Sequence, residues 1–113
     1  MDKRRQLGAN NRITNKYILA FANKIWQDQP KTAEAIAREA SKTVEIACKR
    51  NSVFFSGKSK RGLVGGLFYH FGLTLRSFKT QKEIARILGT TEMTVRSSSR
   101  DWQKQFPDLI KCE

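Results

Sequence analysis

The sequence predicts an all-α protein of five helices that ends in a helix-turn-helix. Three observations support this fold class. Apolar residues recur at spacings of three and four through the first half of the chain. A glycine-containing apolar segment follows, as expected of a buried central helix. Two short helical stretches separated by one glycine come next. At 113 residues, the chain is long enough for one domain with a single core.

The first two helices are predicted over residues 15–29 and 31–50. Asn15 is expected to cap the first helix, and Gln29 to end it, because a residue that precedes proline avoids the helical region. Its apolar face comprises Tyr17, Ile18, Phe21, Ala22, Ile25 and Trp26. That of the second comprises Ala33, Ile36, Ala37, Ala40, Val44, Ala47 and Cys48. The mixed charge opposite this second stripe is typical of a solvated face.

A loop at residues 51–57 is predicted next, with Val53, Phe54 and Phe55 packed over the core. Ser59 is expected to cap the third helix, which is apolar on nearly all sides up to Leu75. Gly62, Gly65, Gly66 and Gly72 count against a helix, at roughly 1 kcal/mol each relative to alanine. Their expected use is to let neighbouring helices pack closely. A glycine-interrupted strand remains the alternative.

The helix-turn-helix is predicted between Thr80 and Arg100. Thr80 and Glu83 form a capping box ahead of the apolar face of Ile84, Ala85, Ile87 and Leu88. Gly89 supplies the left-handed residue that ends this helix, and Thr91 caps the next. The small residue, the turn glycine and the core anchor that the motif needs are Ala85, Gly89 and Val95.

The last helix is expected to have two different faces, one packed on the core and one with hydrogen-bonding groups. Trp102 and Phe106 are expected to pin it to the core, and Pro107 to stop it. Its other side presents hydrogen-bonding groups: Thr91, Glu92, Thr94, Arg96, Ser97 and Arg100. A helix that reads bases needs such groups near its N-terminus, and arginine is the commonest reader of guanine. Two ordinary packed helices would give the same helix–glycine–helix pattern, so this alternative stays open.

The chain is strongly basic, with a formal charge of +12 and a pI near 10.2, which points to a polyanionic partner. Residues 1–79 hold 16 basic and 5 acidic side chains, whereas residues 80–113 hold 6 and 5. Lys58, Lys60 and Arg61 lie beside a helix N-terminus and form a candidate phosphate site. This segment is not a P-loop, because Ser52 stands where the upstream glycine is required. Charge alone fits a non-specific nucleic-acid binder equally well.

The remaining stretches predict little chemistry. Residues 1–14 are interpreted as a basic arm, in which Lys3, Arg4, Arg5 and Arg12 could touch phosphate, or as a solvated tail; the domain spans 15–110, and 111–113 form a tail. Cys48, Cys112 and His70 are too few ligands for a structural zinc site within one chain. No cofactor and no enzymatic activity are expected, since one histidine and no clustered carboxylates are available. The absence of a signal peptide and of a long apolar run predicts an intracellular protein without membrane association.

Several segments resemble the core domain of transcription factor B, a family of archaea and eukaryotes. Residues 57–69, GKSKRGLVGGLFY, are similar to that family's "GKSP-x-G" opening and its alanine-rich central helix. Residues 78–85, FKTQKEIA, resemble its "kRTQkEia" stretch, and residues 89–96, GTTEMTVR, its "GVTEVTIR" recognition segment. The likeness covers about residues 31–110 and is strongest to the second of the family's two repeats.

The resemblance implies a cyclin-like repeat whose helix-turn-helix enters the major groove of double-stranded DNA just upstream of the TATA box. It implies base contact by Arg96 and Met93 and backbone contact by Arg100. With the polar face described above, the predicted base-reading residues are Thr91, Glu92, Met93, Arg96 and Ser97. The predicted backbone contacts are Lys58, Lys60, Arg61, Thr80, Gln81, Lys82, Thr94 and Arg100. The implied partners are DNA and the TATA-binding protein or other transcription machinery, in the archaeal cytoplasm or the nucleus.

Departures from the family pattern leave alternatives open. The sequence has no counterpart of the family's zinc ribbon or first repeat, so either a single repeat or a relative with another partner is expected. Met93 replaces a valine and Lys60 the proline of the opening motif, and Gly65 and Gly66 replace alanines. The base preference is therefore not predicted, nor is the oligomeric state. A cyclin-type protein-interaction module, with a purely architectural helix-turn-helix, is the alternative function.

Overall fold

The computed structural model describes residues 13–110, and this range contains five α-helices and no strand. The helices are α2 (Asn15–Ile25), α3 (Pro30–Arg50), α4 (Lys60–Thr74), α5 (Gln81–Leu88) and α6 (Glu92–Gln105). A short 3-10 helix, η1 (Ser52–Phe55), connects α3 to α4. The prediction of an all-α fold that ends in a helix-turn-helix is confirmed.

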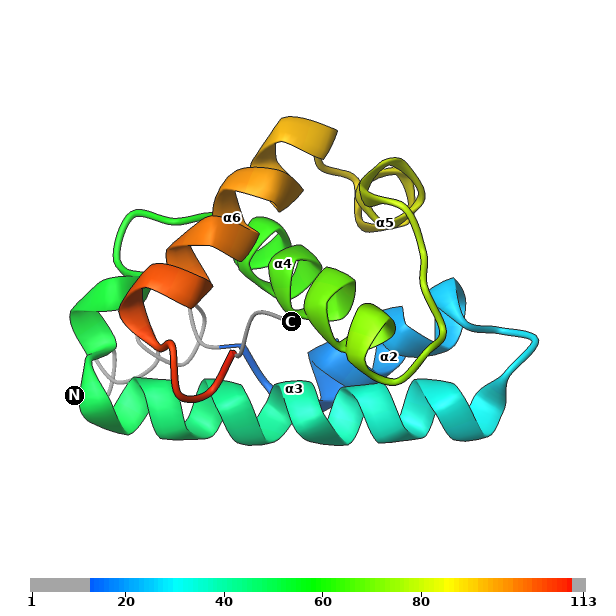
Figure 1. Ribbon diagram of the computed structural model, residues 1–113, viewed down its shortest axis with the longest axis horizontal. Helices are drawn as coiled ribbons and strands as arrows, with labels where there is room; N and C mark the ends of the chain where they lie inside the picture. The colour runs from blue at the N-terminus through cyan, green and yellow to red at the C-terminus, as the bar shows by residue number, and fades with distance from the viewer. Residues whose placement is uncertain (1–12, 111–113) are drawn as a thin grey trace, which may run out of the picture.

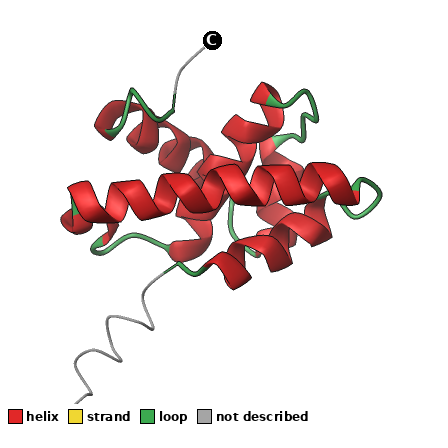
Figure 2. Cartoon of the chain, turned by 90° about the horizontal axis from the view of Figure 1, so that it is seen from below, coloured by secondary structure: helices red, strands yellow, loops and turns green. Residues whose placement is uncertain are grey.

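Helix α4 lies in the middle of the molecule, with α3 along one side and α5 and α6 on the other (Figure 1). Helix α2 packs against α3, and the long α3 crosses the whole face seen in Figure 2. The central position of α4 explains why its sequence lacks a polar face: residues 62–68 and 70–72 are all buried. The segment is a helix, so the alternative of a glycine-interrupted strand is wrong.

The glycines of α4 let α6 approach its backbone. A Cβ atom at Gly66 would lie 2.7 Å from Ser98 Oγ and 2.8 Å from the backbone nitrogen of Ser99. Both distances are shorter than any ordinary carbon contact, so this crossing tolerates no side chain at position 66 without a shift of α6. The predicted use of the glycines, close helix packing, is confirmed.

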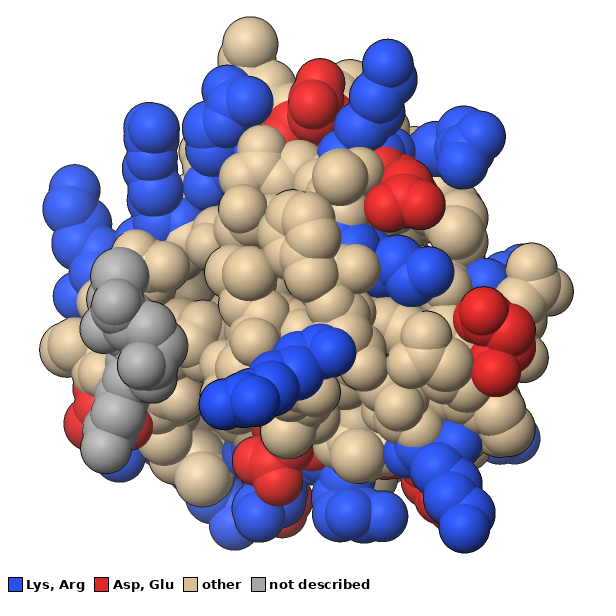
Figure 3. Space-filling view, turned by 45° about the vertical axis from the view of Figure 1, so that its right-hand side comes forward, with Lys and Arg blue, Asp and Glu red and all other residues tan. Residues whose placement is uncertain are grey.

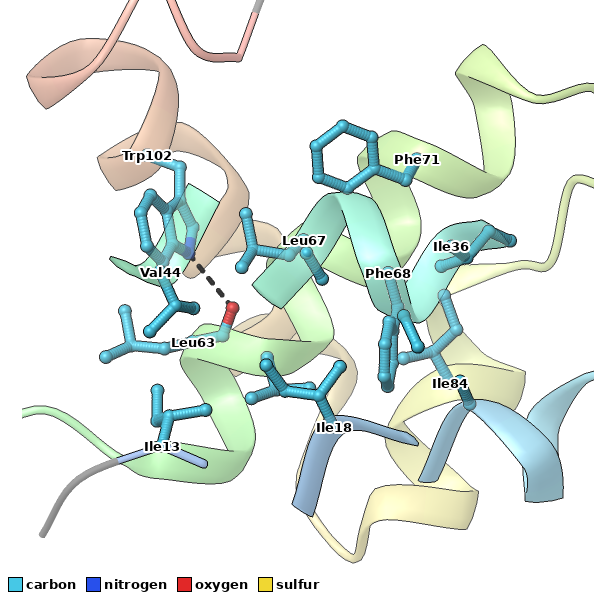
Figure 4. Packing of buried hydrophobic residues seen from close by; sticks show 14 of the residues in the cluster. Ile13, Ile18, Ile36, Val44, Leu63, Leu67, Phe68, Phe71, Ile84 and Trp102 are labelled. Atoms are coloured by element: carbon cyan, nitrogen blue, oxygen red, sulfur yellow. Dashed lines mark hydrogen bonds between the residues drawn. The ribbon is translucent and has the colours of Figure 1, made fainter. Parts of the chain in front are cut away.

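Two buried tryptophans fasten the ends of α4. The indole N–H of Trp102, on α6, donates to the carbonyl oxygen of Leu63 at 2.9 Å (Figure 4). The indole N–H of Trp26 donates to the carbonyl oxygen of Ser77 at 2.9 Å, just beyond the other end of α4. Both indoles are fully buried, and a buried polar group needs such a partner. The predicted anchoring of the last helix by Trp102 and Phe106 is confirmed.

The start and end of the first helix differ from the prediction. Thr14, rather than Asn15, is the N-cap, because its hydroxyl accepts the N–H of Tyr17 at 3.1 Å. The helix ends at Ile25 instead of Gln29: Trp26 leaves the helical region, at φ −110° and ψ 48°. The next helix begins at Pro30, one residue early, as suits a proline whose missing N–H is not needed in the first turn.

The loop after α3 covers the core with one side chain fewer than expected. Phe54 is buried and Phe55 half-buried, as predicted, but Val53 is 74% exposed. Within the 3-10 turn, Phe54 points toward Trp102 and Phe106, with ring centroids 4.9 and 5.1 Å away. The preceding position in so tight a turn faces elsewhere, so Val53 could not follow Phe54 into the core.

Candidate nucleic-acid interface

Helix α5 opens with the predicted capping box. The Thr80 hydroxyl accepts the N–H of Glu83 at 3.1 Å, and the Glu83 carboxylate accepts the N–H of Thr80 at 3.1 Å. The hydrogen bond from the Thr80 backbone, which favours the charged form, holds the pKa of Glu83 below its ordinary value. The first turn of the helix-turn-helix is thereby fixed by two reciprocal bonds.

The turn between α5 and α6 also forms as predicted. Gly89 adopts the left-handed conformation, with φ +77°, and its N–H bonds to the carbonyl of Ala85. Thr91 caps α6 by accepting the N–H of Thr94 at 3.1 Å. Ala85 and Val95 are both buried, so the small residue and the core anchor of the motif occupy their expected places.

The N-terminal half of α6 presents its predicted base-reading residues to solvent. The five, Thr91, Glu92, Met93, Arg96 and Ser97, are all exposed, as is Arg100. Met93 is 71% exposed, which is unusual for a large apolar side chain and places it free to contact a partner. Thr94 differs: it is half-buried, and its hydroxyl lies 2.8 Å from that of Thr91. The side chain of Thr94 therefore has less surface available to contact DNA than its neighbours have.

Arg96 is linked to the start of α5. Its Nε–H donates to Oε1 of Gln81 at 3.3 Å. The bond thus joins a residue predicted to read a base to a residue predicted to contact the DNA backbone. Thr80 and Lys82, which flank Gln81, are exposed. The bond brings the N-terminal turns of both helices together at one end of the helix-turn-helix.

The cations before and within the first turn of α4 are held against other parts of the protein. Ser59 caps this helix, as predicted, by accepting the N–H of Gly62 at 3.1 Å. The ammonium groups of Lys58 and Lys60 lie 4.7 Å above the ring of Phe54 and 5.0 Å above that of Tyr17. Such cation–π contacts restrain the lysine side chains without neutralising them.

Arg61 lies beside the turn of the helix-turn-helix. Its Nη1 atom is only 2.9 Å from where a Cβ atom of Gly89 would be. Burial raises the pKa of Tyr17, and the hydrogen bond from Arg61 opposes this shift. The guanidinium thus connects α4 and α2 to the glycine turn.

A groove connects the residues at the start of α4 with the exposed residues of α6, although the two groups lie at least 30 positions apart in the sequence. It encloses about 290 Å³ between the start of α4 and the exposed side of α6. Its lining comprises Lys58, Ser59, Gly62, Leu63, Met93, Thr94, Ser97, Ser98 and Asp101. The predicted phosphate contact Lys58 therefore shares one concave surface with the predicted base readers Met93 and Ser97.

The sequence interpretation missed two charged residues at this surface. Asp101 lines the groove and also a second one of about 250 Å³, where Lys58 and Lys104 contribute as well. Asp101 lies four residues after Ser97, so the helical period could have placed it on the same face.

The arm residues Lys3, Arg4, Arg5 and Arg12 lie outside the described residues.

Basic and acidic side chains are interspersed on at least one face of the molecule. On the face in Figure 3, Lys and Arg side chains surround a broad uncharged area, with acidic side chains interspersed among them. Opposite charges meet in places: Arg50, at the end of α3, donates to both carboxylate oxygens of Asp108 at 3.0 and 2.8 Å. This bond lowers the pKa of Asp108 and ties the segment after α6 to α3.

No group of three or more potential metal ligands occurs in residues 13–110, and no helix in this range is long and apolar enough to cross a membrane. Cys48 is half-buried against the core. His70 is buried, with its ring 4.9 Å from that of Phe71.

Comparison with known proteins relates the chain to one group. No protein-family model matches it. It is 32% identical over 101 residues to the transcription initiation factor IIB of Pyrococcus abyssi, a match that covers 86% of this chain and 33% of that protein. Transcription initiation factor IIB 2 of Thermoplasma volcanium is 33% identical over 104 residues, covering 88% of this chain and 30% of that protein. The Aeropyrum pernix factor is 37% identical over 68 residues, 60% of this chain and 20% of that protein. The chain thus spans about a third or less of these relatives.

Proposed function

The chain is related to the transcription factor B family over about a third of those proteins' length, and from this premise we propose that it is a DNA-binding transcription-factor module that reads bases in the major groove through α6. The observation that carries the proposal is the exposed N-terminal face of α6, which has hydrogen-bonding groups and one apolar side chain at the end where recognition helices contact bases. In this arrangement the base-reading residues are Thr91, Glu92, Met93, Arg96 and Ser97.

Backbone contacts come from both sides of that face. Lys58, across the groove from Met93, and the exposed start of α5 at Thr80 and Lys82 would hold adjacent phosphates. Lys60, Arg61, Gln81, Thr94 and Arg100 complete the proposed set. Phosphate contacts position a protein on the duplex, while base contacts specify the sequence. The spread of positive charge in Figure 3 supplies the general attraction to DNA.

The domain at 15–110 is proposed to act beside other transcription components inside the cell. One helix-turn-helix covers few base pairs, so useful specificity calls for a second DNA-bound protein or a second copy of the chain. The relatives are named as initiation factors, which favours a partner such as the TATA-binding protein. Their names also favour a role in binding over one in catalysis.

A protein-interaction module is the second candidate, and a separate surface favours it. Leu73, Leu75 and Phe78 are 49%, 38% and 52% exposed at the end of α4 and in the link to α5. Phe78 also packs edge-on against the ring of Tyr69, at 6.0 Å between centroids. Large apolar side chains exposed within a few residues of one another are typical of protein contacts.

Selection of binding sites from random duplexes at physiological salt distinguishes the two candidates. We expect the wild-type chain to enrich a motif of a few base pairs and Arg96→Ala to lose preference at one of them. Arg38→Ala, which removes an exposed arginine of α3, is the matched control and should keep the motif. Absence of enrichment by the wild-type chain, together with no salt-dependent affinity for DNA, would support the protein-interaction module instead.

A further inference from the structure

The bond between Gln81 and Arg96 connects the two helices of the helix-turn-helix through their side chains. The geometry points to Gln81 as a positioning residue that sets the base preference of this protein by orienting Arg96. This inference rests on the proposed function and assigns Gln81 a role different from the phosphate contact that its sequence context predicts.

The backbone at both ends of the bond is fixed. Gln81 is the first residue of α5, directly after the Thr80 cap, and it is half-buried. Arg96 directly follows Val95, which is fully buried. Helix α6 is further held where Ser98 and Ser99 cross Gly66 of α4. The Gln81 side chain therefore meets Arg96 from a defined direction.

The bond occupies the donor of Arg96 that is least useful for end-on recognition. A guanidinium has five N–H groups, and Gln81 accepts the one on Nε. The groups on Nη1 and Nη2 stay available as a parallel pair, which is the arrangement that matches O6 and N7 of guanine. A long exposed arginine normally loses much rotamer freedom when it binds. Because Gln81 already restrains Arg96, less of this freedom is lost and this one geometry is favoured.

The same bond leaves Gln81 able to contact a phosphate, so its two possible roles are separated by their effect on sequence preference. Its carbonyl oxygen accepts the guanidinium N–H, whereas its amide nitrogen, the atom that would donate to a phosphate, is not used by this bond. A phosphate contact by that nitrogen would act alike on every sequence. Orientation of Arg96 would instead act only on the base pair that Arg96 reads, so the two roles give different experimental results.

Two substitutions at position 81 separate them. Gln81→Met keeps the length of the side chain and removes the acceptor, whereas Gln81→Glu keeps an acceptor for Nε–H. Lys82→Ala, on the same turn, is the control for a sequence-independent phosphate contact. Each variant is titrated with the duplex that the wild-type chain selects and with the same duplex changed at the base pair whose preference Arg96→Ala weakens most.

We expect Gln81→Met to lower the affinity ratio of the two duplexes about three- to tenfold. Gln81→Glu should retain the ratio while its negative charge weakens binding to both duplexes, and Lys82→Ala should weaken both equally. Combined with Arg96→Ala, Gln81→Met should have no further effect on the ratio, because it acts through Arg96.

An equal loss on both duplexes in Gln81→Met would overturn the inference and identify a phosphate contact. A further fall of the ratio in the double variant would overturn it as well, because Gln81 would then read a base itself. In both cases the effect of Arg96→Ala stands, so the proposed function survives. If the wild-type chain itself prefers neither duplex, the proposed function fails and this inference fails with it.

Discussion

Helices α4 and α6 cross at a glycine, yet they differ in almost every other respect. In α4, 10 of the 15 residues are buried, and none of its turns offers a continuous polar face. In α6, only Val95, Ser98, Ser99 and Trp102 are buried among 14 residues. Helix α4 packs against other elements on nearly all sides, whereas α6 buries a single stripe and leaves the rest of its surface exposed.

The contrast separates stability from recognition by position. A side chain on the buried stripe of α6 contributes to the same core as α4, and its removal should unfold the domain. A side chain on the exposed face of α6 touches little of the protein, so its removal should change binding and leave folding intact. Substitutions on the two faces of α6, and in the helices that it contacts, test this separation.

Trp102→Ala should lower the free energy of unfolding by about 3–5 kcal/mol. The change removes the hydrogen bond to Leu63 and leaves a cavity beside Phe54 and Phe106. Urea denaturation monitored by circular dichroism measures the loss. Gln105→Ala, on the exposed side of the last turn, is the control and should change stability by less than about 0.5 kcal/mol.

Gly66→Ala should cost about 1–3 kcal/mol although alanine is the better helix former. The new methyl group would meet the backbone of Ser99, which has nowhere to move without shifting α6. Gly62→Ala is the informative comparison, because its Cβ would meet the side-chain methyl of Thr94, at 2.6 Å. Thr94→Ser should relieve Gly62→Ala and leave the cost of Gly66→Ala unchanged in the same denaturation assay. Equal relief of both would contradict the close backbone crossing.

Arg96→Ala should weaken binding to the selected DNA site by about 1–3 kcal/mol. Its unfolding free energy should stay within about 0.5 kcal/mol of wild type, because the residue is exposed and leaves the core intact. Fluorescence anisotropy with the selected duplex and thermal denaturation, on the same preparation, give the two values. A stability loss as large as the binding loss would remove the distinction between the two faces of α6.

Thr80→Ala should cost about 1 kcal/mol of stability through loss of the cap of α5. The reciprocal bond of Glu83 adds a pH dependence. Because the pKa of Glu83 is lower in the folded protein, its contribution is fully present above the pKa of the unfolded chain and is lost as the pH falls through the folded pKa. The stability difference between wild type and Glu83→Gln, measured by denaturation from neutral to acidic pH, should therefore shrink under acid. A difference that grows toward low pH would contradict the capping box.

Local features of the fold could be predicted from the sequence, and those that depend on contacts between helices could not. Thr80, Gly89 and Thr91 act within a few residues of themselves, so their roles follow from short-range rules. The early end of α2 falls at Trp26, whose indole N–H bonds to the carbonyl oxygen of Ser77, 51 residues away. No local pattern contains that partner.

The same division applies to the candidate site. The exposed face of α6 follows from the helical period, because Val95 and Trp102 mark the opposite side. The groove that joins Lys58 to Met93, and the bond from Gln81 to Arg96, arise from the crossing of α4, α5 and α6. Residues that the sequence assigned to separate tasks therefore lie at one surface, which only the assembled structure reveals.

The central claim is that the exposed face of α6 reads base edges in the major groove. The most direct measurement replaces each guanine of the selected duplex in turn with 7-deazaguanine, which removes the N7 acceptor from the major groove and leaves the minor groove unchanged. We expect a loss of affinity at one or two positions for the wild-type chain and no loss there for Arg96→Ala. Unchanged affinity at every position for both proteins would contradict major-groove reading by α6.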